Sequence, residues 1–350
     1  MSLREIAERT GVSVSTVSRA LSGQNRISED VRQKVIEAAR EIGYLDGRLR
    51  KALHPGFSSL AIVAPSGLLA PSDTNFVAWT IFEGLREACT ARGLKPIPIT
   101  SDGASLDPAT VAPRLEATRA EAVAVFFDDN PKVVAAAAAL GRPVVLLAGQ
   151  DPSMQVPSIG IGNRYAARLG TDFLIGKGHR RITLVTWGNR YTIRQREDGF
   201  REVAAERGLD EAELRILRLT GFDPGTAEAE LGAAFDEGRV AGTTALFCLS
   251  DNIALGALRA AATRGIRVPQ DLSILGFDDT VAGEMTDPPL TTIHAPFREI
   301  GPAAIEELEL QARNSDGPRI PRRIELSCTL VERRSCAPPP PDEHLGETGA

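Results

Sequence analysis

A long alternation of short apolar runs and amphipathic segments, which begins at Leu60, is the feature that most constrains the fold of this chain. The short runs predict buried strands, and the longer segments place apolar residues at helical spacing. Strands that alternate with helices form parallel sheets covered by helices on both faces. The predicted strands are 60–64, 95–99, 122–127, 143–147, 181–186, 214–219, 244–249 and 272–277. The predicted helices are 75–92, 107–118, 131–140, 163–177, 192–207, 225–237 and 251–264.

The alternation stops near residues 150–162 and then starts again, which divides it into two sets of roughly 100 residues each. We therefore expect an α/β protein with two Rossmann-like lobes within residues 60–336. Residues 337–350 are polar and rich in proline and show no periodicity, so we expect a disordered tail there.

The beginning of the chain follows a different, all-α pattern. Residues 2–22 predict two short helices joined by a tight turn, in which Gly11 ends the first helix and Ser13 caps the second. A third predicted helix begins after Ser28 and carries an apolar stripe that closes a small core. We therefore predict a helix-turn-helix headpiece over residues 1–45.

The outward face of the second predicted helix consists of small hydroxyls and one arginine, namely Ser15, Thr16, Ser18, Arg19 and Ser22. An ordinary solvated face would be richer in Glu and Lys. Short hydroxyls allow a helix to enter the major groove and donate to phosphates, and arginine binds guanine through two hydrogen bonds. This face is therefore expected to contact double-stranded DNA.

The distribution of charge agrees with a DNA-binding headpiece. The whole chain has a formal net charge of −6. Residues 1–59 hold 10 Lys and Arg against 7 Asp and Glu, a net of +3, so the remainder carries −9. A basic head on an acidic body is expected when only the head meets phosphate.

The run from Ala7 to Leu21 has the pattern A-x(3)-G-V-S-x(2)-T-V-S-R-x-L, which resembles the helix-turn-helix of the LacI (lactose-repressor) family of bacterial transcription factors. Later runs are similar to segments of the same family and follow in the same order. They are GHRRITLV (178–185), RGIRVPQDLSILGFDD (264–279) and PPLTTI (288–293).

This resemblance implies that the two lobes are of the periplasmic-binding-protein-like type. It implies a repressor that binds a pseudo-palindromic DNA operator as a homodimer and responds to a small-molecule effector, a sugar or a related metabolite. We expect the homodimer to act in the cytoplasm, at the nucleoid.

Residues 46–59 correspond to the hinge of the family, whose pattern is similar to Y-x-P-N-x-x-A-x-x-L. Tyr44 and Leu53 match this pattern, whereas Asp46, Gly47 and Arg50 replace its Pro, Asn and Ala. Glycine weakens a helix, so a hinge helix and a flexible basic linker both remain open. The predicted DNA contacts are Ser13, Val14, Ser15, Thr16, Ser18, Arg19, Asn25, Arg26, Tyr44, Arg50 and Leu53.

Polar residues at the carboxyl ends of strands in the second lobe predict the effector site, because ligands of open parallel sheets bind there. The predicted effector contacts are Arg196, Ser250, Asp251 and Asp278; the resemblance implies all but Asp251. Asp251 is also explained as a helix cap, and Arg196 as a structural ion pair. One departure from the family is Gly162, which stands where an Asp is usual.

The sequence lacks the parts that most enzyme classes require. It has no GxGxxG after the first predicted strand and no GxxxxGK[ST]. Its four cysteines are scattered without metal-ligand spacing, so we expect no metal, no cofactor and no catalytic residues. No apolar run reaches a membrane-spanning length of about 18 residues, and the N-terminus does not resemble a signal peptide.

Two other function classes remain as alternatives. A solute-binding protein for transport would share the two lobes, but it would need an export signal and would lack residues 2–21. A sugar-processing α/β enzyme with a DNA-binding head is the other alternative, but no catalytic constellation supports it.

Overall fold

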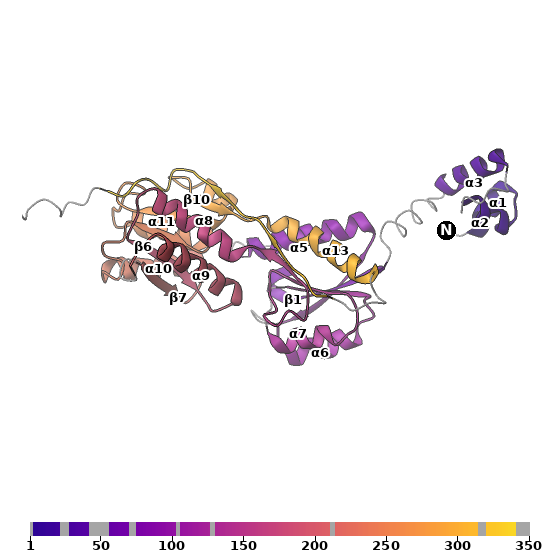
Figure 1. Cartoon of the computed structure of the whole chain (residues 1–350), viewed down its shortest axis with the longest axis horizontal. Helices are drawn as coiled ribbons and strands as arrows, with labels where there is room; N and C mark the ends of the chain where they lie inside the picture. The colour runs from indigo at the N-terminus through magenta and orange to yellow at the C-terminus, as the bar shows by residue number, and fades with distance from the viewer. Residues whose placement is uncertain are drawn as a thin grey trace, which may run out of the picture.

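The computed structural model describes residues 3–21, 28–41, 56–69, 75–102, 106–126, 130–210, 214–313 and 320–340. These residues form a small bundle of three helices and two α/β lobes (Figure 1). The predicted fold class is confirmed. In the described part of the chain, no helix combines the length and the apolar character that a membrane span requires.

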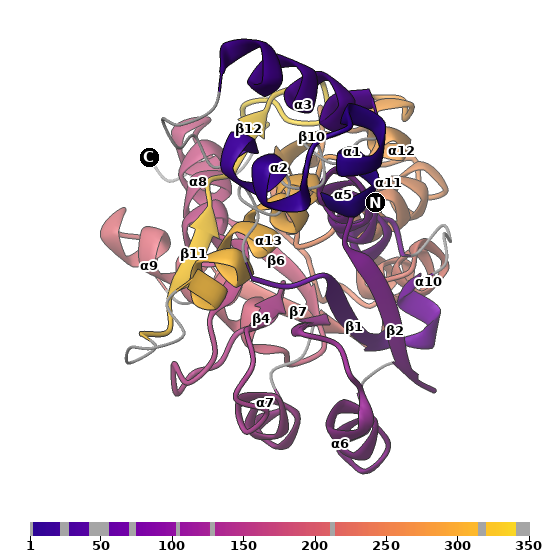
Figure 2. The same ribbon diagram turned by 90° about the vertical axis from the view of Figure 1, so that its right-hand side faces the viewer.

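The headpiece consists of α1 (Leu3–Thr10), α2 (Val14–Leu21) and α3 (Glu29–Glu41), which lie in front of the lobes in Figure 2. Ile6, Val17 and Val35, one from each helix, are fully buried against one another. Ala20 is buried and Leu21 is half-buried, so Val17 and Ala20 form the inner face of α2.

The turn between α1 and α2 forms as the sequence predicts. Gly11 has φ +69°, and its N–H donates to the carbonyl of Ala7 at 3.0 Å. A left-handed residue suits glycine, which has no Cβ. The Ser13 hydroxyl accepts from the backbone N–H of Thr16 at 3.2 Å and so caps α2.

The first lobe contains an all-parallel sheet in the order β11-β5-β4-β3-β1-β2. Its strands are β1 (Ser59–Pro65), β2 (Lys95–Ser101), β3 (Ala122–Phe126), β4 (Val144–Leu147), β5 (Ser158–Ile161) and β11 (Arg323–Leu326). Its helices are η1 (Ser66–Leu69), α5 (Phe76–Arg92), α6 (Pro108–Ala117), α7 (Pro131–Ala138) and α13 (Phe297–Arg313). α5 and α13 cover one face of the sheet, and α6 and α7 cover the other (Figure 1).

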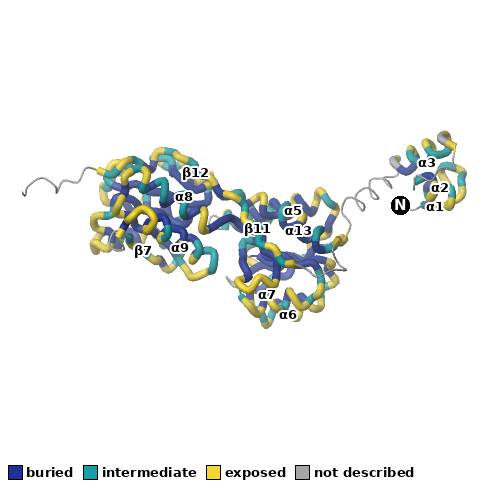
Figure 3. Tube along the Cα trace, viewed as in Figure 1, coloured by how far each residue is buried: buried dark blue, intermediate teal, exposed yellow. Residues whose placement is uncertain are grey.

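The second lobe contains a sheet in the order β12-β10-β9-β8-β6-β7, in which only the edge strand β12 is antiparallel. Its strands are β6 (Ile182–Trp187), β7 (Leu214–Leu219), β8 (Ala245–Cys248), β9 (Ser273–Asp278), β10 (Thr291–His294) and β12 (Thr329–Val331). Its helices are α8 (Asn163–Gly176), α9 (Tyr191–Glu206), α10 (Pro224–Asp236), α11 (Asp251–Ala262) and α12 (Val281–Glu284). Buried residues, dark blue in Figure 3, follow the strands of both lobes.

The chain passes between the lobes three times: from β5 to α8, from β10 to α13, and from β11 to β12. The sequence pattern did not predict the elements beside these passages. β5 lies within the expected break at 150–162, because SIGI contains only two large apolar residues. β11 and β12 have four and three residues, too few for a periodic signal.

The C-terminal boundary of the second lobe lies later than predicted. The backbone N–H of Ala337 donates to the Ser273 hydroxyl at 3.0 Å, and its carbonyl is 2.9 Å from Nε2 of His179. The chain beyond residue 336 therefore continues along the lobe as far as residue 340. Residues 341–350 lie outside the described residues, and the disordered tail stays a prediction for them.

Two glycines allow α5 and α13 to pack with their backbones in contact. A Cβ on Gly84 would lie 2.0 Å from the carbonyl oxygen of Arg298, and one on Gly301 would lie 2.1 Å from the backbone nitrogen of Leu85. Neither obstacle is a flexible side chain, so neither could move aside. The last turn of α13 also contacts the beginning of the lobe, because Ala312 fills the space beside Gly56.

We predict that Gly301→Ala destabilises the protein by at least about 2 kcal/mol, because the added methyl group must separate two helix backbones. The measurement is urea unfolding. Gly176→Ala is the matched control: Gly176 ends α8, and a Cβ there would meet nothing within 4 Å. A Gly301→Ala protein as stable as the control would show that the two helices are not closely packed.

Candidate functional site

The exposed face of α2 is the first candidate site. Ser13, Val14, Ser15, Ser18 and Arg19 are exposed, and Thr16 is half-buried. The structure thus presents on one helix all the contacts predicted there. The other predicted DNA contacts, Asn25, Arg26, Tyr44, Arg50 and Leu53, lie outside the described residues, as does most of the hinge, and they stay predictions.

Hydrogen bonds arrange the hydroxyls at the start of α2. The hydroxyl oxygen of Ser13 lies 2.8 Å from those of Ser15 and Thr16. Nε of Arg19 donates to the carbonyl of Ser15 at 3.3 Å, so the guanidinium lies back over the first turn. The resulting surface offers small donors beside one cation, which suits a phosphate backbone and a base edge.

Arg196 is the centre of the second candidate site, in the second lobe. It projects from α9, is only 7% exposed and lies 3.7 Å from the centre of the Phe277 ring. Its Nε donates to Oδ1 of Asn163 at 2.7 Å, and Nη1 donates to the carbonyl of Leu249 at 2.8 Å. These two hydrogen-bond partners are neutral, but the carboxyl group of Asp278 lies near enough to raise the pKa of Arg196, so a structural ion pair remains the alternative to an effector contact.

Asp278 is the carboxyl group of this site. Burial raises the pKa of Asp278 to about 8, although the nearby charge of Arg196 lowers it. Burial in turn lowers the pKa of Arg196, and Asp278 opposes that change. Each group therefore favours the charged form of the other in a place from which water is largely removed.

Ser250 connects the two strand ends that carry the site. Its hydroxyl donates to Oδ2 of Asp278 at 3.2 Å and accepts from the backbone N–H of Asn252, which caps α11. Ser250 follows β8, and Asp278 is the last residue of β9. The structure thus brings Arg196, Ser250 and Asp278 together at the carboxyl edge of the sheet.

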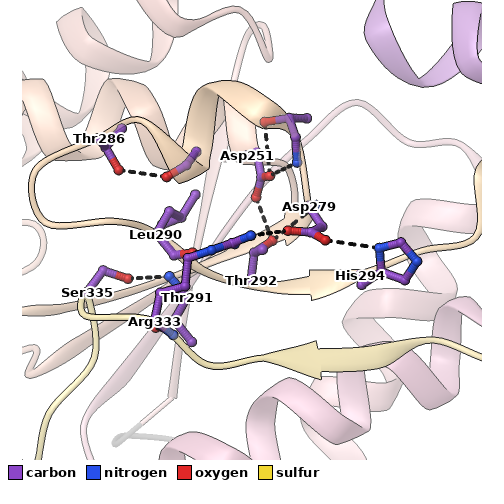
Figure 4. A network of polar contacts seen from close by, with 11 residues as sticks. Asp251, Asp279, Thr286, Leu290, Thr291, Thr292, His294, Arg333 and Ser335 are labelled. Atoms are coloured by element: carbon purple, nitrogen blue, oxygen red, sulfur yellow. Dashed lines mark hydrogen bonds and ion pairs between the residues drawn. The ribbon is translucent and has the colours of Figure 1, made fainter.

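Asp251, the fourth predicted effector contact, has hydrogen-bond partners inside the lobe. Its Oδ1 accepts from the hydroxyl of Thr292 at 2.6 Å, and its Oδ2 accepts from the N–H and the hydroxyl of Thr280 at 2.7 and 3.1 Å (Figure 4). Burial raises its pKa to about 6 although these hydrogen bonds lower it. With no exposed surface and both oxygens bonded, Asp251 connects α11 to β10, and its contact with an effector stays a prediction.

Asp279, the carboxylate directly after β9, contacts a different set of residues. Asp278 and Asp279 have φ +120° and +58°, which non-glycine residues rarely adopt. The Asp279 carboxylate accepts from Nη2 of Arg333 at 2.8 Å and lies 3.0 Å from Nδ1 of His294 (Figure 4). Adjacent carboxylates therefore serve two sides of the sheet edge, one beside Arg196 and one beside the passage from β10 to α13.

Sequence reasoning missed Asn163 and Glu325. Asn163 begins α8, is 3% exposed and orients Arg196; a polar residue at the start of a buried helix was the available signal. A Cβ on Gly162 would lie 3.8 Å from Oε2 of Glu325. A carboxylate from β11 thus lies beside the position where the family pattern has an Asp.

The chain matches two described protein families. Residues 2–46 match the family described as bacterial regulatory proteins, lacI family. Residues 171–336 match the periplasmic binding protein-like domain. The first match covers the headpiece, and the second covers most of the second lobe with the final passages of the chain.

Complete relatives and solved structures agree with these matches. The HTH-type transcriptional regulator MalR of Streptomyces coelicolor (strain ATCC BAA-471 / A3(2) / M145) is 33% identical over 97% of both chains. A structure of the transcriptional regulator CelR in complex with cellobiose is 25% identical over 96% of this chain and 99% of that one, with a TM-score of 0.68. A structure of the lac repressor dimer bound to operator and an anti-inducer is 24% identical over 96% of this chain and 99% of that one, with a TM-score of 0.71. The chain belongs to the lacI family of bacterial regulatory proteins.

Proposed function

We propose that this protein is a ligand-responsive, sequence-specific transcriptional repressor that acts as a homodimer in the bacterial cytoplasm, at the nucleoid. The observation that carries this proposal is the pairing of two surfaces in one chain. One is the DNA-binding face of α2, with its exposed hydroxyls and arginine. The other is the candidate effector site in the second lobe, which contains the buried side chains of Arg196 and Asp278. A solute-binding protein would need only the second surface.

The DNA-binding part of the proposal assigns base recognition to Arg19. Arg19 is exposed on the same helix as Ser15 and Ser18, whose short side chains allow the helix to approach a groove closely. The hydroxyls then hold the phosphates, and the guanidinium reads a base edge. A pseudo-palindromic operator follows from two such headpieces in a dimer.

We predict that Arg19→Ala reduces affinity for the operator by about 1–3 kcal/mol and relaxes base preference, while weak, salt-sensitive DNA binding remains. The measurement is a binding-site selection followed by titration of the selected duplex. Arg9→Ala is the control, because Arg9 is an exposed arginine of α1 that pairs with Glu41, and its base preference should match the wild type. If Arg19→Ala selects the same bases as the wild type, Arg19 contacts only phosphates and does not recognise a base.

The homodimer part of the proposal assigns the interface to the lobes. Val281 and Met285, at α12 of the second lobe, are 57% and 81% exposed, and they stand four residues apart, so they lie on one side of this helix end. A second copy of the same surface would bury them. The headpiece has only a small hydrophobic core, so we do not expect the headpiece alone to form a stable dimer interface.

We predict that a fragment of residues 56–340 stays folded and dimeric at micromolar concentration, and that Met285→Glu shifts it toward monomer. The measurement is sedimentation velocity, with far-UV circular dichroism to verify folding. Glu284→Gln, at the adjacent exposed position, is the control. A monomeric wild-type fragment would contradict the assignment of the interface to the lobes.

The effector part of the proposal places a sugar or related metabolite beside Arg196, Ser250 and Asp278. A guanidinium and a carboxylate held in one place orient polyhydroxylated ligands through charge-assisted hydrogen bonds. The solved structures similar to this chain include the CelR complex with cellobiose and an Enterococcus faecium regulator with bound ribose, and both names support this ligand class.

We predict that Asp278→Asn still binds the operator but loses its response to the effector. The amide keeps the shape of the side chain and removes one charge-assisted acceptor, so effector affinity should fall at least about tenfold. An effector shifts the conformational equilibrium only by its differential affinity for the two states. Titration of the effector into the variant–operator complex measures the response, with exposed Asp198→Asn as control. If the effector releases the variant from the operator at the concentration that releases the wild type, the effector pocket does not include Asp278.

A further inference from the structure

A cavity of about 290 Å³ lies at the amino edge of the sheet of the first lobe. It is lined by Ala138, the last residue of α7, and by Leu310 of α13, and these two helices cover opposite faces of the sheet (Figure 1). Val144 begins β4 and Pro157 directly precedes β5, so both lining residues belong to this edge. The volume is close to the lower end of the range for small-molecule sites, which is about 300–1,000 Å³.

This cavity lies away from the lobe junction. β5 and β11 continue from their carboxyl ends to α8 and β12 of the second lobe, so the junction is at the opposite edge of the sheet. The four residues of β5 separate the two edges by about 13 Å. Gln311, which lines the cavity, directly precedes Ala312, and Ala312 fills the space beside Gly56 at the beginning of the first lobe. The cavity is therefore distinct from the candidate effector site.

The buried polar side chains of the cavity are held in place by hydrogen bonds. The Gln311 side chain accepts from the backbone N–H of Val144 at 3.0 Å and donates to its carbonyl at 2.9 Å. Glu307 is only 2% exposed; its Oε1 accepts from Gln311 at 3.2 Å, and its Oε2 accepts from Nε of Arg322 at 2.8 Å. The cavity is therefore preformed, and the negative charge of Glu307 is already compensated by Arg322.

The more exposed side chains of the cavity supply positive charge. Arg322 uses Nε and Nη2 to bind Glu307, whereas its Nη1 has no hydrogen-bond partner among the described residues. Nη1 of Arg142 donates to two backbone carbonyls at 2.8 and 2.6 Å, which holds a second guanidinium beside the cavity. Two arginines and one glutamate line the cavity, so its lining has a net formal charge of +1. This charge favours an anion.

We propose that this cavity is a second ligand site, which binds a small anion with an apolar body, such as an aromatic carboxylate or sulfonate. The guanidinium of Arg322 binds the anionic oxygens, because arginine forms charge-assisted hydrogen bonds with groups of this kind. The apolar body packs against Leu310 and against Ile320, whose side chain is 81% exposed in the empty cavity. Burial of this apolar surface contributes to affinity.

The first test titrates naphthalene-2-sulfonate into the full-length protein by calorimetry, with 2-naphthol as its neutral analogue. We expect one site per chain and a sulfonate affinity at least about fivefold higher than that of the naphthol, because only the sulfonate is attracted by the positive lining. A dissociation constant above about 1 mM for the sulfonate would overturn the site. Equal affinities for the two compounds would overturn the preference for an anion.

The second test locates the bound sulfonate with two neighbouring substitutions, Ala138→Trp and Ala139→Trp. Both alanines are exposed at the end of α7, but only Ala138 lines the cavity. Ala138→Trp should fill the cavity and weaken sulfonate binding at least about tenfold, and Ala139→Trp should bind as the wild type does. Far-UV circular dichroism verifies that both variants are folded. If Ala138→Trp binds the sulfonate as tightly as Ala139→Trp, the sulfonate lies elsewhere and the proposal is wrong.

The third test changes the charge of the lining. Gln155→Glu adds a carboxylate on an exposed lining side chain, so it should weaken sulfonate binding about threefold to fivefold and leave the affinity for 2-naphthol unchanged. Gln270→Glu is the matched control, because it makes the same change of net charge in an exposed turn of the second lobe. If both variants weaken sulfonate binding equally, the anion is not bound in this cavity.

Discussion

The three passages of the chain between the lobes are the constraint on which the rest of this structure depends. The sheet of the first lobe is completed by β11 and that of the second lobe by β12, so both sheets need strands from the last part of the chain. Asn163, which orients Arg196, stands at the first passage, and His294, which contacts Asp279, stands at the second. The polar groups of the candidate effector site are therefore held by the same backbone that joins the lobes.

The central strands and most helices could be predicted from the sequence because their burial is uniform. β3 and β4 are buried along their whole length, as expected of parallel strands covered on both faces. The edge elements carry no comparable signal. β11 alternates charged and apolar residues over four positions, and α13 contains Gly301 and Pro302, which argue against a helix when read locally. Their conformations depend on partners far away in the sequence.

The candidate site was predictable to a similar extent. Arg196, Ser250 and Asp278 follow from their places after strands and from the family resemblance, and the structure brings them together. Asp251 occupies an equivalent place in the sequence, yet its oxygens bond Thr280 and Thr292. Only the threonines, 29 and 41 residues further along the chain, decide that difference.

α13 connects the lobe junction with the beginning of the first lobe. It begins directly after the second passage, at Phe297, and its last turn contacts Gly56, where the chain from the headpiece enters the first lobe. A helix of 17 residues is a rod of about 25 Å. The backbone contact at Gly84 and Gly301 holds the beginning of α13 against α5. Because a helix is stiff, any rotation at the lobe junction that tilted α13 about this contact would move its far end, beside Gly56, by a larger distance.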